Sequence, residues 1–202
     1  MDLLSLLLLP VAVAADDLYD PAPPADAAFV RVVNATAAAA ASRVGDKDFG
    51  VVGPAEASPY RVVAKGERAV QIGAARADLS VAAGSFYTLA LDGGGQVHAV
   101  TDPTNTNLAR TLLVLYNFSE APSAALKTAD GGTEIIGGVA PDGHESRVVN
   151  PLKVDLAAFV GDQAVGTFAG LSLGRGAAYS VIVTGAADAP KAVWVQNQTS
   201  TK

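Results

Sequence analysis

The sequence of 202 residues contains no cysteine and only two histidines. Without thiols, the chain has no disulfides to staple a small exported domain. Zinc sites use Cys and His at short ligand spacings, and His98 and His144 are too far apart in the sequence to form one. No Asp-rich loop has the calcium-binding register of an EF-hand. We therefore expect no metal ion and no cofactor.

Charge is also scarce. Charged residues make up 17% of the chain, and the formal net charge is −6. No basic stripe is present, which excludes nucleic acid as a partner. Half of the residues are hydrophobic, and there are 20 Gly and 11 Pro. This composition rules out a disordered chain and suits many short strands joined by turns.

Residues 1–14 have the features of a signal peptide. Residues 3–9 are leucine except for Ser5, Pro10 ends the run, and Ala12-Val-Ala14 supplies the small residues of a cleavage site. The run is too short to span a bilayer, which takes about 20 apolar residues. No Lys or Arg precedes it, and an N-terminal core strand is the alternative. We expect export to the periplasm and no membrane span after cleavage.

Residues 15–26 form a proline-bearing arm. Proline fixes φ near the extended region, so the arm should be extended and not helical. Such a segment either lies across its own domain or binds a partner. We take Leu18, Tyr19 and Pro21 as candidate partner-binding residues.

Four short blocks occur twice in the same order. The first, Phe29-Val-Arg-Val-Val-Asn34, returns as Leu112-Leu-Val-Leu-Tyr-Asn117. The other pairs begin at Arg61 and Arg147, at Tyr87 and Tyr179, and at Gln96 and Lys191. The repeat predicts two domains, 27–102 and 110–197, with a linker at 103–109 and a loose polar tail from about residue 196 to residue 202. We interpret the first pair of blocks as the opening strands of two binding platforms.

The predicted fold is all-β, with two tandem small β-sandwich domains of the carbohydrate-binding-module or immunoglobulin-like kind. Strands of about five residues at this spacing, separated by Gly and Pro, are typical of sandwiches. The alternation of Val30 and Val32 with Arg31 places the two valines on one face. The alanine run 37–41 has helical propensity, but its position after a strand and turn favours a second strand. Domains this small are marginal alone, so we expect a packed interface between them.

No catalytic constellation is evident. A serine hydrolase needs a nucleophile, a histidine and a carboxylate that orients it, and no nucleophile elbow is present. His98 aligns with Val193 of the second copy, which favours a structural role, and His144 lies in a short polar turn between two strands. Asn34, Asn117 and Asn197 each begin an Asn-Xaa-Ser/Thr triplet, which we interpret as turn residues and not glycan acceptors.

The only tryptophan, Trp194, aligns with Ala99 and lies on the opposite face of its strand from Val193 and Val195. It either caps the seam between the domains or is an exposed contact residue, and we take it as a candidate for partner binding. The other large aromatic residues of the second domain are expected in its core: Tyr116, Phe159, Phe168 and Tyr179.

The sequence resembles the AlgF family of periplasmic alginate O-acetylation proteins. The matching stretches, which together cover essentially the whole mature chain, are Leu18-Tyr-Asp-Pro21, residues 29–34, Leu126-Lys-Thr-Ala-Asp-Gly131, Val149-Asn-Pro-Leu-Lys-Val154 and Val193-Trp-Val195. The resemblance implies an exported β-sandwich protein with carbohydrate-binding-module-like domains. It also implies an accessory role, in which the protein brings together separate periplasmic or membrane-associated acetyl-transferring proteins.

Three hypotheses follow, in order of preference. The first is a non-catalytic adaptor for O-acetylation of an alginate-like exopolysaccharide. The second is a carbohydrate-binding protein that holds the polyuronate directly, weakly because both are negatively charged. The third is an acetyltransferase or esterase in its own right that uses His98 or His144.

Overall fold

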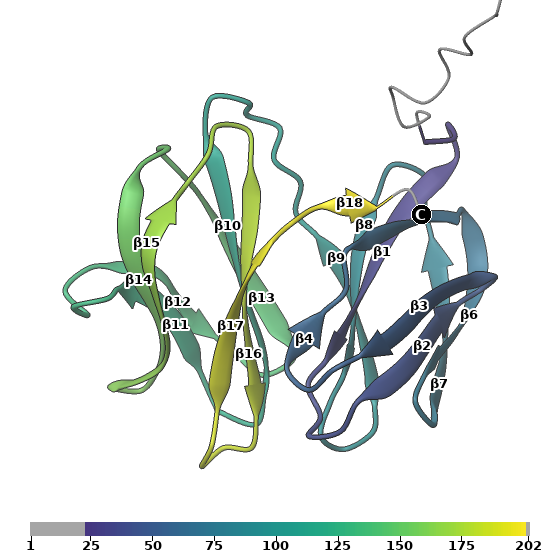
Figure 1. Cartoon of the computed structure of the whole chain (residues 1–202), viewed down its shortest axis with the longest axis horizontal. Coiled ribbons are helices and arrows are strands. Elements are labelled where there is room, and N and C mark those ends of the chain that lie inside the picture. The colour runs from purple at the N-terminus through teal and green to yellow at the C-terminus, as the bar shows by residue number, and fades with distance from the viewer. Residues whose placement is uncertain (1–22, 201–202) are drawn as a thin grey trace, which may run out of the picture.

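The computed structural model describes residues 23–200. The expected leader and the arm residues Leu18, Tyr19 and Pro21 lie outside the described residues. Every element between residues 23 and 200 is a β-strand, and the strands form four sheets that are arranged side by side along the long axis (Figure 1). This part of the chain contains no helix with the length and hydrophobicity to cross a membrane.

The first domain consists of sheets A and B. In spatial order, sheet A contains β18 (Thr199–Ser200), β5 (Tyr60–Ala64), β1 (Ala27–Asn34), β8 (Phe86–Leu91) and β9 (Val97–Asp102), with β4 (Glu56–Ala57) also paired to β1. Sheet B contains β3 (Lys47–Val52), β2 (Ala40–Val44), β6 (Gly66–Ile72) and β7 (Ala75–Val81). Between the two sheets lies an apolar core that includes Val30, Val32, Ile72 and Leu89.

The second domain consists of sheets C and D. Sheet C contains β13 (Gly143–Val149), β10 (Thr111–Ser119), β16 (Ala178–Gly185) and β17 (Lys191–Gln196). Sheet D contains β12 (Glu134–Val139), β11 (Ala124–Thr128), β14 (Lys153–Val160) and β15 (Gln163–Ser172). Its core includes Leu113, Leu115, Leu126 and Leu156.

The two domains share one topology. The order β5-β1-β8-β9 in sheet A matches β13-β10-β16-β17 in sheet C, and β3-β2-β6-β7 in sheet B matches β12-β11-β14-β15 in sheet D. In both domains the opening strand pairs in parallel with the strand that begins near the repeated tyrosine, β1 with β8 and β10 with β16. The all-β fold and the duplication predicted from the sequence are therefore confirmed.

The two opening strands, β1 and β10, are buried on both faces. Val30 and Val32 face the core of the first domain as predicted, but Val33 on the other face is also fully buried. In β10 every residue is buried. The outer faces of the two strands pack on each other, so the expected packed interface between the domains is confirmed and these two strands present no face to a partner. The interpretation of the domains that they open as binding platforms stays a prediction.

Two local expectations also need correction. The second strand begins at Ala40, so residues 37–39 of the alanine run belong to the preceding turn. The tail is not loose before residue 200, because β18 crosses from the second domain and pairs in parallel with β5 of the first (Figure 1). The carbonyl of Gln198 also accepts a hydrogen bond from the amide of Tyr60, at 2.9 Å. A polar tail suits this position, because Asn197 of the tail meets the polar side chains of Arg31 and Ser180.

Candidate functional site

The seam between the domains has an apolar centre. Sheet A meets sheet C through buried residues of both opening strands, β8, β9 and β16: Val33, Ala35, Ala90, Val100, Leu112, Val114, Tyr116, Phe118 and Ile182. Val193 and Val195 of β17 pack against this cluster. Because these contacts exclude water from both sheets, the two sandwiches form a single packed body.

A buried asparagine lies at the end of β1 and near the end of β10. The Nδ2 group of Asn34 donates to the carbonyls of Ala38 and Val52, and that of Asn117 donates to Ala121 and Val139. Each Oδ1 accepts from the backbone amide and the hydroxyl of the residue two positions on, Thr36 or Ser119. Both residues lie within their strands, so the expectation that they are turn residues is wrong, and their side chains are fully buried where they bond to the segments that follow.

Arg31 lies in the seam beside this apolar centre and is 0% exposed. Its Nε donates to the hydroxyl of Thr88 at 2.8 Å, and its two terminal nitrogens donate to Asn197 Oδ1 and Ser180 Oγ, both at 3.0 Å. Its guanidinium also lies over the ring of Tyr60, 4.8 Å from the centroid. Arg31 therefore joins strands of both domains and the segment that follows β17.

Asp102 supplies the negative charge of this network. The Thr88 hydroxyl donates to it, and the hydroxyls of Tyr60 and Tyr116 each donate to one carboxylate oxygen at 2.7 Å. Burial raises the pKa of Tyr60 well above its ordinary value, and the nearby Asp102 adds to that rise against the opposing effect of Arg31. Burial and the same carboxylate raise the pKa of Tyr116. Both tyrosines are therefore held as neutral hydrogen-bond donors.

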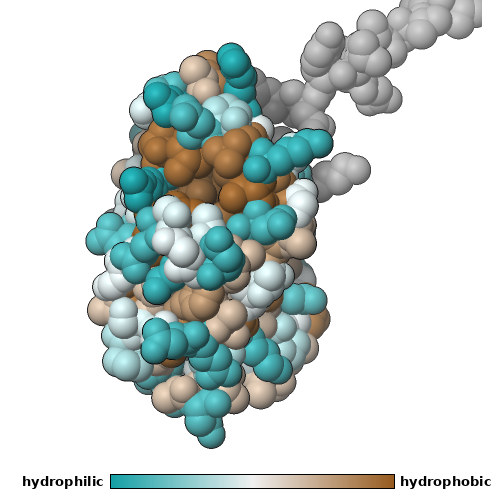
Figure 2. Space-filling view, turned by 90° about the vertical axis from the view of Figure 1, so that its left-hand side faces the viewer, coloured by the Kyte–Doolittle hydropathy of each residue, from teal (hydrophilic) through white to brown (hydrophobic). Residues whose placement is uncertain are grey.

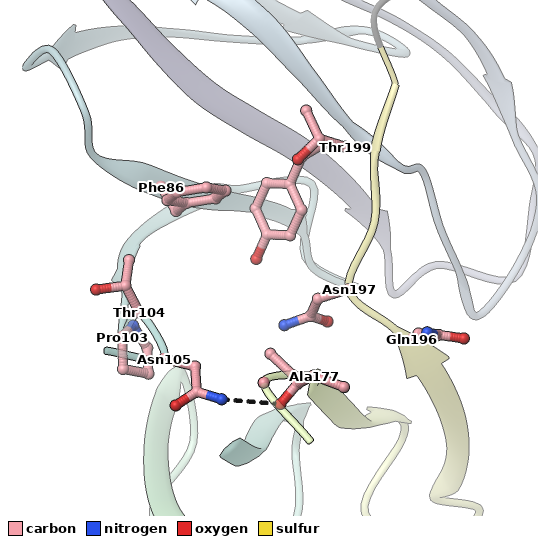
Figure 3. A pocket seen from close by; sticks show the side chains of 11 residues that line it. Phe86, Pro103, Thr104, Asn105, Ala177, Gln196, Asn197 and Thr199 are labelled. Atoms are coloured by element: carbon pink, nitrogen blue, oxygen red, sulfur yellow. Dashed lines mark hydrogen bonds between the residues drawn. The ribbon is translucent and has the colours of Figure 1, made fainter. Parts of the chain in front are cut away.

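A cleft of about 300 Å³ opens next to the network, between the two domains. The first domain contributes Tyr60 and Phe86, and the second contributes the segment 176–178. The connecting residues 103–105 and the residues after β17 line the remaining sides (Figure 3). Asn105 is itself held by hydrogen bonds from its Nδ2 to the carbonyls of Arg110 and Ala177, each 3.1 Å.

A second groove opens elsewhere along the seam and has a different character. It is lined by Asp92, Glu120 and Asp142 among mostly small residues, together with Phe118. Close to it, His98 Nε2 lies 2.7 Å from Asp92, and His98 Nδ1 lies 3.6 Å from Asp142 of the other domain. Both ring nitrogens thus face carboxylates. The described residues contain no group of three potential metal ligands in this groove or anywhere else between residues 23 and 200.

The two remaining sequence candidates, His144 and Trp194, lie in different places. His144 stacks on Tyr116, with ring centroids 5.6 Å apart. Trp194 is partly buried at the core of the second domain, where its ring lies 5.1 Å from that of Tyr179 and 5.8 Å from that of Phe168. It therefore does not cap the seam, which Val193 and Val195 do from the opposite face. Its place in partner binding stays a prediction.

The seam residues were not predicted as a site. Arg31 was visible as a charge within an apolar run, at the position where the second copy has Val114. Asp102, Thr88, Ser180 and Asn197 come from separate strands and segments, and no spacing in the sequence connects them. Asn197 was expected to be a turn residue, but in the structure its Oδ1 accepts hydrogen bonds from Arg31 and Ser180.

Together, the fold and the seam define a tandem β-sandwich protein whose two domains are packed as one unit. Comparison with known proteins shows which family the chain matches. The family described as "Alginate O-acetyl transferase AlgF" matches residues 3–180. The alginate biosynthesis protein AlgF of Pseudomonas putida is 36% identical over 178 residues, which cover 88% of this chain and 82% of that protein. AlgF of Pseudomonas aeruginosa is 33% identical over 195 residues, or 96% and 90% of the two chains.

Two solved structures are also similar. The C-terminal domain of AlgF from P. aeruginosa covers 44% of this chain and 98% of its own length, with 36% identity and a TM-score of 0.40. The N-terminal domain of the same protein covers 41% and 100%, with 28% identity and a TM-score of 0.37. From the family match and the identities over nearly whole chains, this chain belongs to the AlgF family of alginate biosynthesis proteins.

Proposed function

We propose that the protein is a non-catalytic accessory component of alginate O-acetylation, which holds separate acetyl-transferring proteins together. The observation that carries the proposal is the seam. A continuous apolar cluster and the buried Arg31 network join the two sandwiches. Two domains fixed in this way present separate surfaces in one constant orientation, and an adaptor needs this property to position two partners.

The outer side of the second domain supports the same proposal. In the view of Figure 2, which faces the side of the molecule where sheet D lies, hydrophobic residues gather in one area that hydrophilic residues border. Apolar surface rimmed by polar residues is typical of protein interaction sites. This side therefore offers a partner a surface that is separate from the seam.

The histidines support the non-catalytic part of the proposal. A general base must reach the hydroxyl whose proton it removes, but both nitrogens of His98 face carboxylates. His144 stacks on Tyr116, which donates its hydroxyl to Asp102 and not to a histidine. The acetyl transfer is then performed by partner proteins. In the proposed scheme these are periplasmic or membrane-associated, in keeping with the leader at residues 1–14.

The test measures catalysis and partner binding separately. His98→Ala and His144→Ala variants are expected to restore alginate O-acetylation in cells that lack the protein, and the purified protein is expected not to turn over an activated acetyl ester. Turnover of the acetyl ester by the wild-type protein that disappears in either histidine variant would show that the protein is an enzyme and would contradict the proposal. Tagged full-length protein should capture acetyl-transferring proteins from periplasmic extract, as identified by mass spectrometry.

The predicted contact residues are tested in the same capture experiment. Deletion of residues 16–24 removes Leu18, Tyr19 and Pro21, and Trp194→Phe keeps the aromatic packing while it changes the indole. Weaker capture would assign the contact to the altered segment. Capture that is equal to wild type in both variants would exclude these four residues from the partner interface.

A second candidate function is direct, weak contact with the polysaccharide. The specific observation that favours it is the cleft between the domains, which combines the aromatic rings of Tyr60 and Phe86 with hydroxyl and amide groups.

A further inference from the structure

The cleft beside the buried polar network has walls from both domains. Tyr60 and Phe86 belong to sheet A, and Thr199 belongs to β18, the strand that crosses between the domains. The linker residues 103–105 and residues 176–178 of the second domain line the other sides (Figure 3). An occupant of this cleft therefore contacts both sandwiches at once.

Apolar surface is left uncovered on both sides of this cleft. On the first domain, the ring of Phe86 stacks on that of Phe29, with centroids 4.4 Å apart, and meets the ring of Tyr60 edge-on at 5.2 Å. Phe29 and Phe86 are only half-buried, so part of this aromatic wall still faces water. On the second domain, Leu108 lies beside Gly176, which lines the cleft, and is 79% exposed. The cleft therefore offers an apolar occupant contacts on two sides.

The loops next to the cleft carry positive charge. Segments 103–111 and 171–178 contain Arg110 and Arg175 and no Asp or Glu. The amide of Gly176 donates to the carbonyl of Arg110 at 2.8 Å, so the two loops lie together. Both arginines are exposed, and neither guanidinium has an ionic or hydrogen-bonding partner among the described residues. The cleft therefore favours an occupant that combines apolar side chains with negative charge.

Residues 15–22 of the same chain have this chemistry. Their sequence is Ala-Asp-Asp-Leu-Tyr-Asp-Pro-Ala, with three carboxylates, no Lys or Arg, and Leu18-Tyr19 at the centre. These residues lie outside the described part of the chain, which begins at residue 23. An apolar pair between acidic residues complements an aromatic wall beside a cationic rim, and proline-bearing segments are common ligands of aromatic-lined grooves.

The described chain begins within reach of the cleft. The carbonyl of Pro24 accepts a hydrogen bond from the amide of Ala27, and that of Asp26 accepts one from the amide of Lys65 at 3.1 Å. These bonds hold the chain at the start of β1, and Phe29, two residues later, is already stacked on the cleft wall. In Figure 1 the start of β1 and β18 lie at the same end of the first domain. The centre of the acidic segment is ten residues before Phe29, and a chain of that length spans up to about 33 Å.

We propose that residues 15–22 occupy the cleft between the two domains of their own chain. Leu18 and Tyr19 cover the aromatic wall, and the carboxylates face Arg110 and Arg175. A short tether gives the segment an effective concentration on the order of millimolar, so a contact that is weak between separate molecules is largely formed within one. Because the cleft spans the seam, the seated segment ties the first strand to the loops of the second domain. This contact exists whether or not the protein is an adaptor.

The first test takes advantage of the chain's lack of cysteine. In isotopically labelled protein that begins at residue 15, Ala15→Cys provides a single attachment point for a nitroxide spin label. The amide NMR signals of residues 103–105 and 176–178 should be strongly broadened, and those of residues 92–94 in the acidic groove should not. Broadening centred on any other surface, or none, would overturn the proposal.

A mixed sample distinguishes one chain from two. Spin-labelled protein without isotope is mixed with isotopically labelled protein without the spin label, so that only contacts between molecules broaden signals. No broadening is expected. Broadening at the cleft would make the occupant the segment of a second copy, and it would contradict a contact within one chain.

Charge reversal tests how the segment is recognised. A peptide of residues 15–22 should shift the cleft signals of protein that lacks these residues. Arg110→Glu/Arg175→Glu replaces two attractions with two repulsions and should weaken peptide binding about tenfold. The matched control, Arg43→Glu/Arg76→Glu, changes two exposed arginines that line a separate pocket on sheet B, and its binding should stay within about twofold of wild type. Equal weakening by the two double variants would mean that the peptide responds to net charge, and it would overturn the site.

The partner-capture experiment separates this contact from the adaptor proposal. If the spin label broadens the cleft signals and protein without residues 15–22 still captures acetyl-transferring proteins, both proposals stand and the segment is not the partner contact. If wild-type protein captures partners and the label broadens no cleft signal, the cleft proposal fails and the adaptor proposal stands. Cleft broadening without partner capture would support the contact within the chain and overturn the adaptor role.

Discussion

The two domains have the same strand order but use one pair of equivalent positions in opposite ways. Asn34 and Asn117 make the same set of hydrogen bonds in their own domains. Arg31 and Val114 occupy the equivalent position three residues earlier, but their roles differ. The arginine forms a buried polar network, and the valine is part of the apolar seam. The shared asparagine thus holds each sandwich together, whereas the position of Arg31 and Val114, where the copies differ, helps to join one sandwich to the other.

The largest effect on the seam is expected from Arg31→Met, which gives the first copy an apolar residue at this position, as in the second copy. Asp102 would keep its hydroxyl donors but lose the compensating positive charge inside a buried seam. Removal of one partner of a buried ionic network costs about 3–5 kcal/mol. Urea unfolding of the full-length protein should show this loss and a separation of the two domains into distinct transitions.

Arg43→Met is the matched control. Its ion pair with Asp48, at 3.6 Å, is exposed, and surface pairs contribute about 0–1 kcal/mol. If the Arg31 and Arg43 variants lose similar stability, the seam network does not join the domains.

The second prediction tests the shared positions. Asn34→Ala and Asn117→Ala each leave two carbonyl groups without their donor, at a cost of about 2–4 kcal/mol. Because the bonding is the same, the two losses should agree within about 1 kcal/mol. Hydrogen exchange should place the loosened amides in the domain that carries the substitution.

Asn107→Ala provides the baseline for this pair. Asn107 accepts one hydrogen bond from the amide of Ala109 in an exposed loop, so its removal should cost under about 1 kcal/mol. A large difference between the Asn34 and Asn117 variants would mean that the two copies do not use the shared residue in the same way.

The third prediction concerns Tyr60 and Tyr116, which face the seam from different domains. Burial raises the pKa of both. A raised tyrosine pKa means that the folded state holds the proton more tightly than the unfolded state. The resulting stabilisation is complete below about pH 10, the ordinary tyrosine pKa, and is lost as the pH rises above it, at about 1.4 kcal/mol per pH unit for one such group.

Absorbance of tyrosinate during alkaline titration measures this effect. Two of the five tyrosines should stay protonated until the chain unfolds, and the Tyr60→Phe/Tyr116→Phe double variant should lose the steep decline of stability above pH 10. Ionisation of all five tyrosines in protein that is still folded would contradict the buried network.

The sequence was sufficient to predict the duplicated fold because strand patterning is local. Alternating apolar residues, turn glycines and the repeat from Phe29 to Val195 determine strands one at a time, and equal spacing in the two copies implies equal topology. The seam was predicted only as an interface. Its polar network joins Arg31, Asp102 and Asn197 across three parts of the chain, and such a meeting depends on how the sheets pack.

The tail shows the same limit. Residues 196–200 look like a loose end by composition, since they are polar and follow the last repeated block. In the structure Thr199 and Ser200 pair with β5, and Asn197 bonds to Arg31. Polar composition predicts exposure only when no buried charge is available as a partner, and Arg31 is such a partner.

The smallest expected effect comes from His98→Val, which gives the first copy the residue that the second copy has at Val193. Burial alone would raise the pKa of Asp92, but hydrogen bonds from His98 and from the backbone of Gln96 and Gly94 hold it below its ordinary value. That stabilisation is present above the unfolded pKa of about 3.9 and is lost as the pH falls through the folded value. Carboxyl NMR titration should show the Asp92 pKa rising toward its ordinary value in the variant.

The loss of stability should nevertheless stay under about 1 kcal/mol at neutral pH, because the side chains of His98 and Asp92 are 27% and 24% exposed and water screens their interaction. Since Asp142 belongs to the other domain, its contact with His98 joins the two sandwiches at the rim of the seam, beside the acidic groove. A loss comparable to that of Arg31→Met would show that the rim, and not the buried network, holds the domains together.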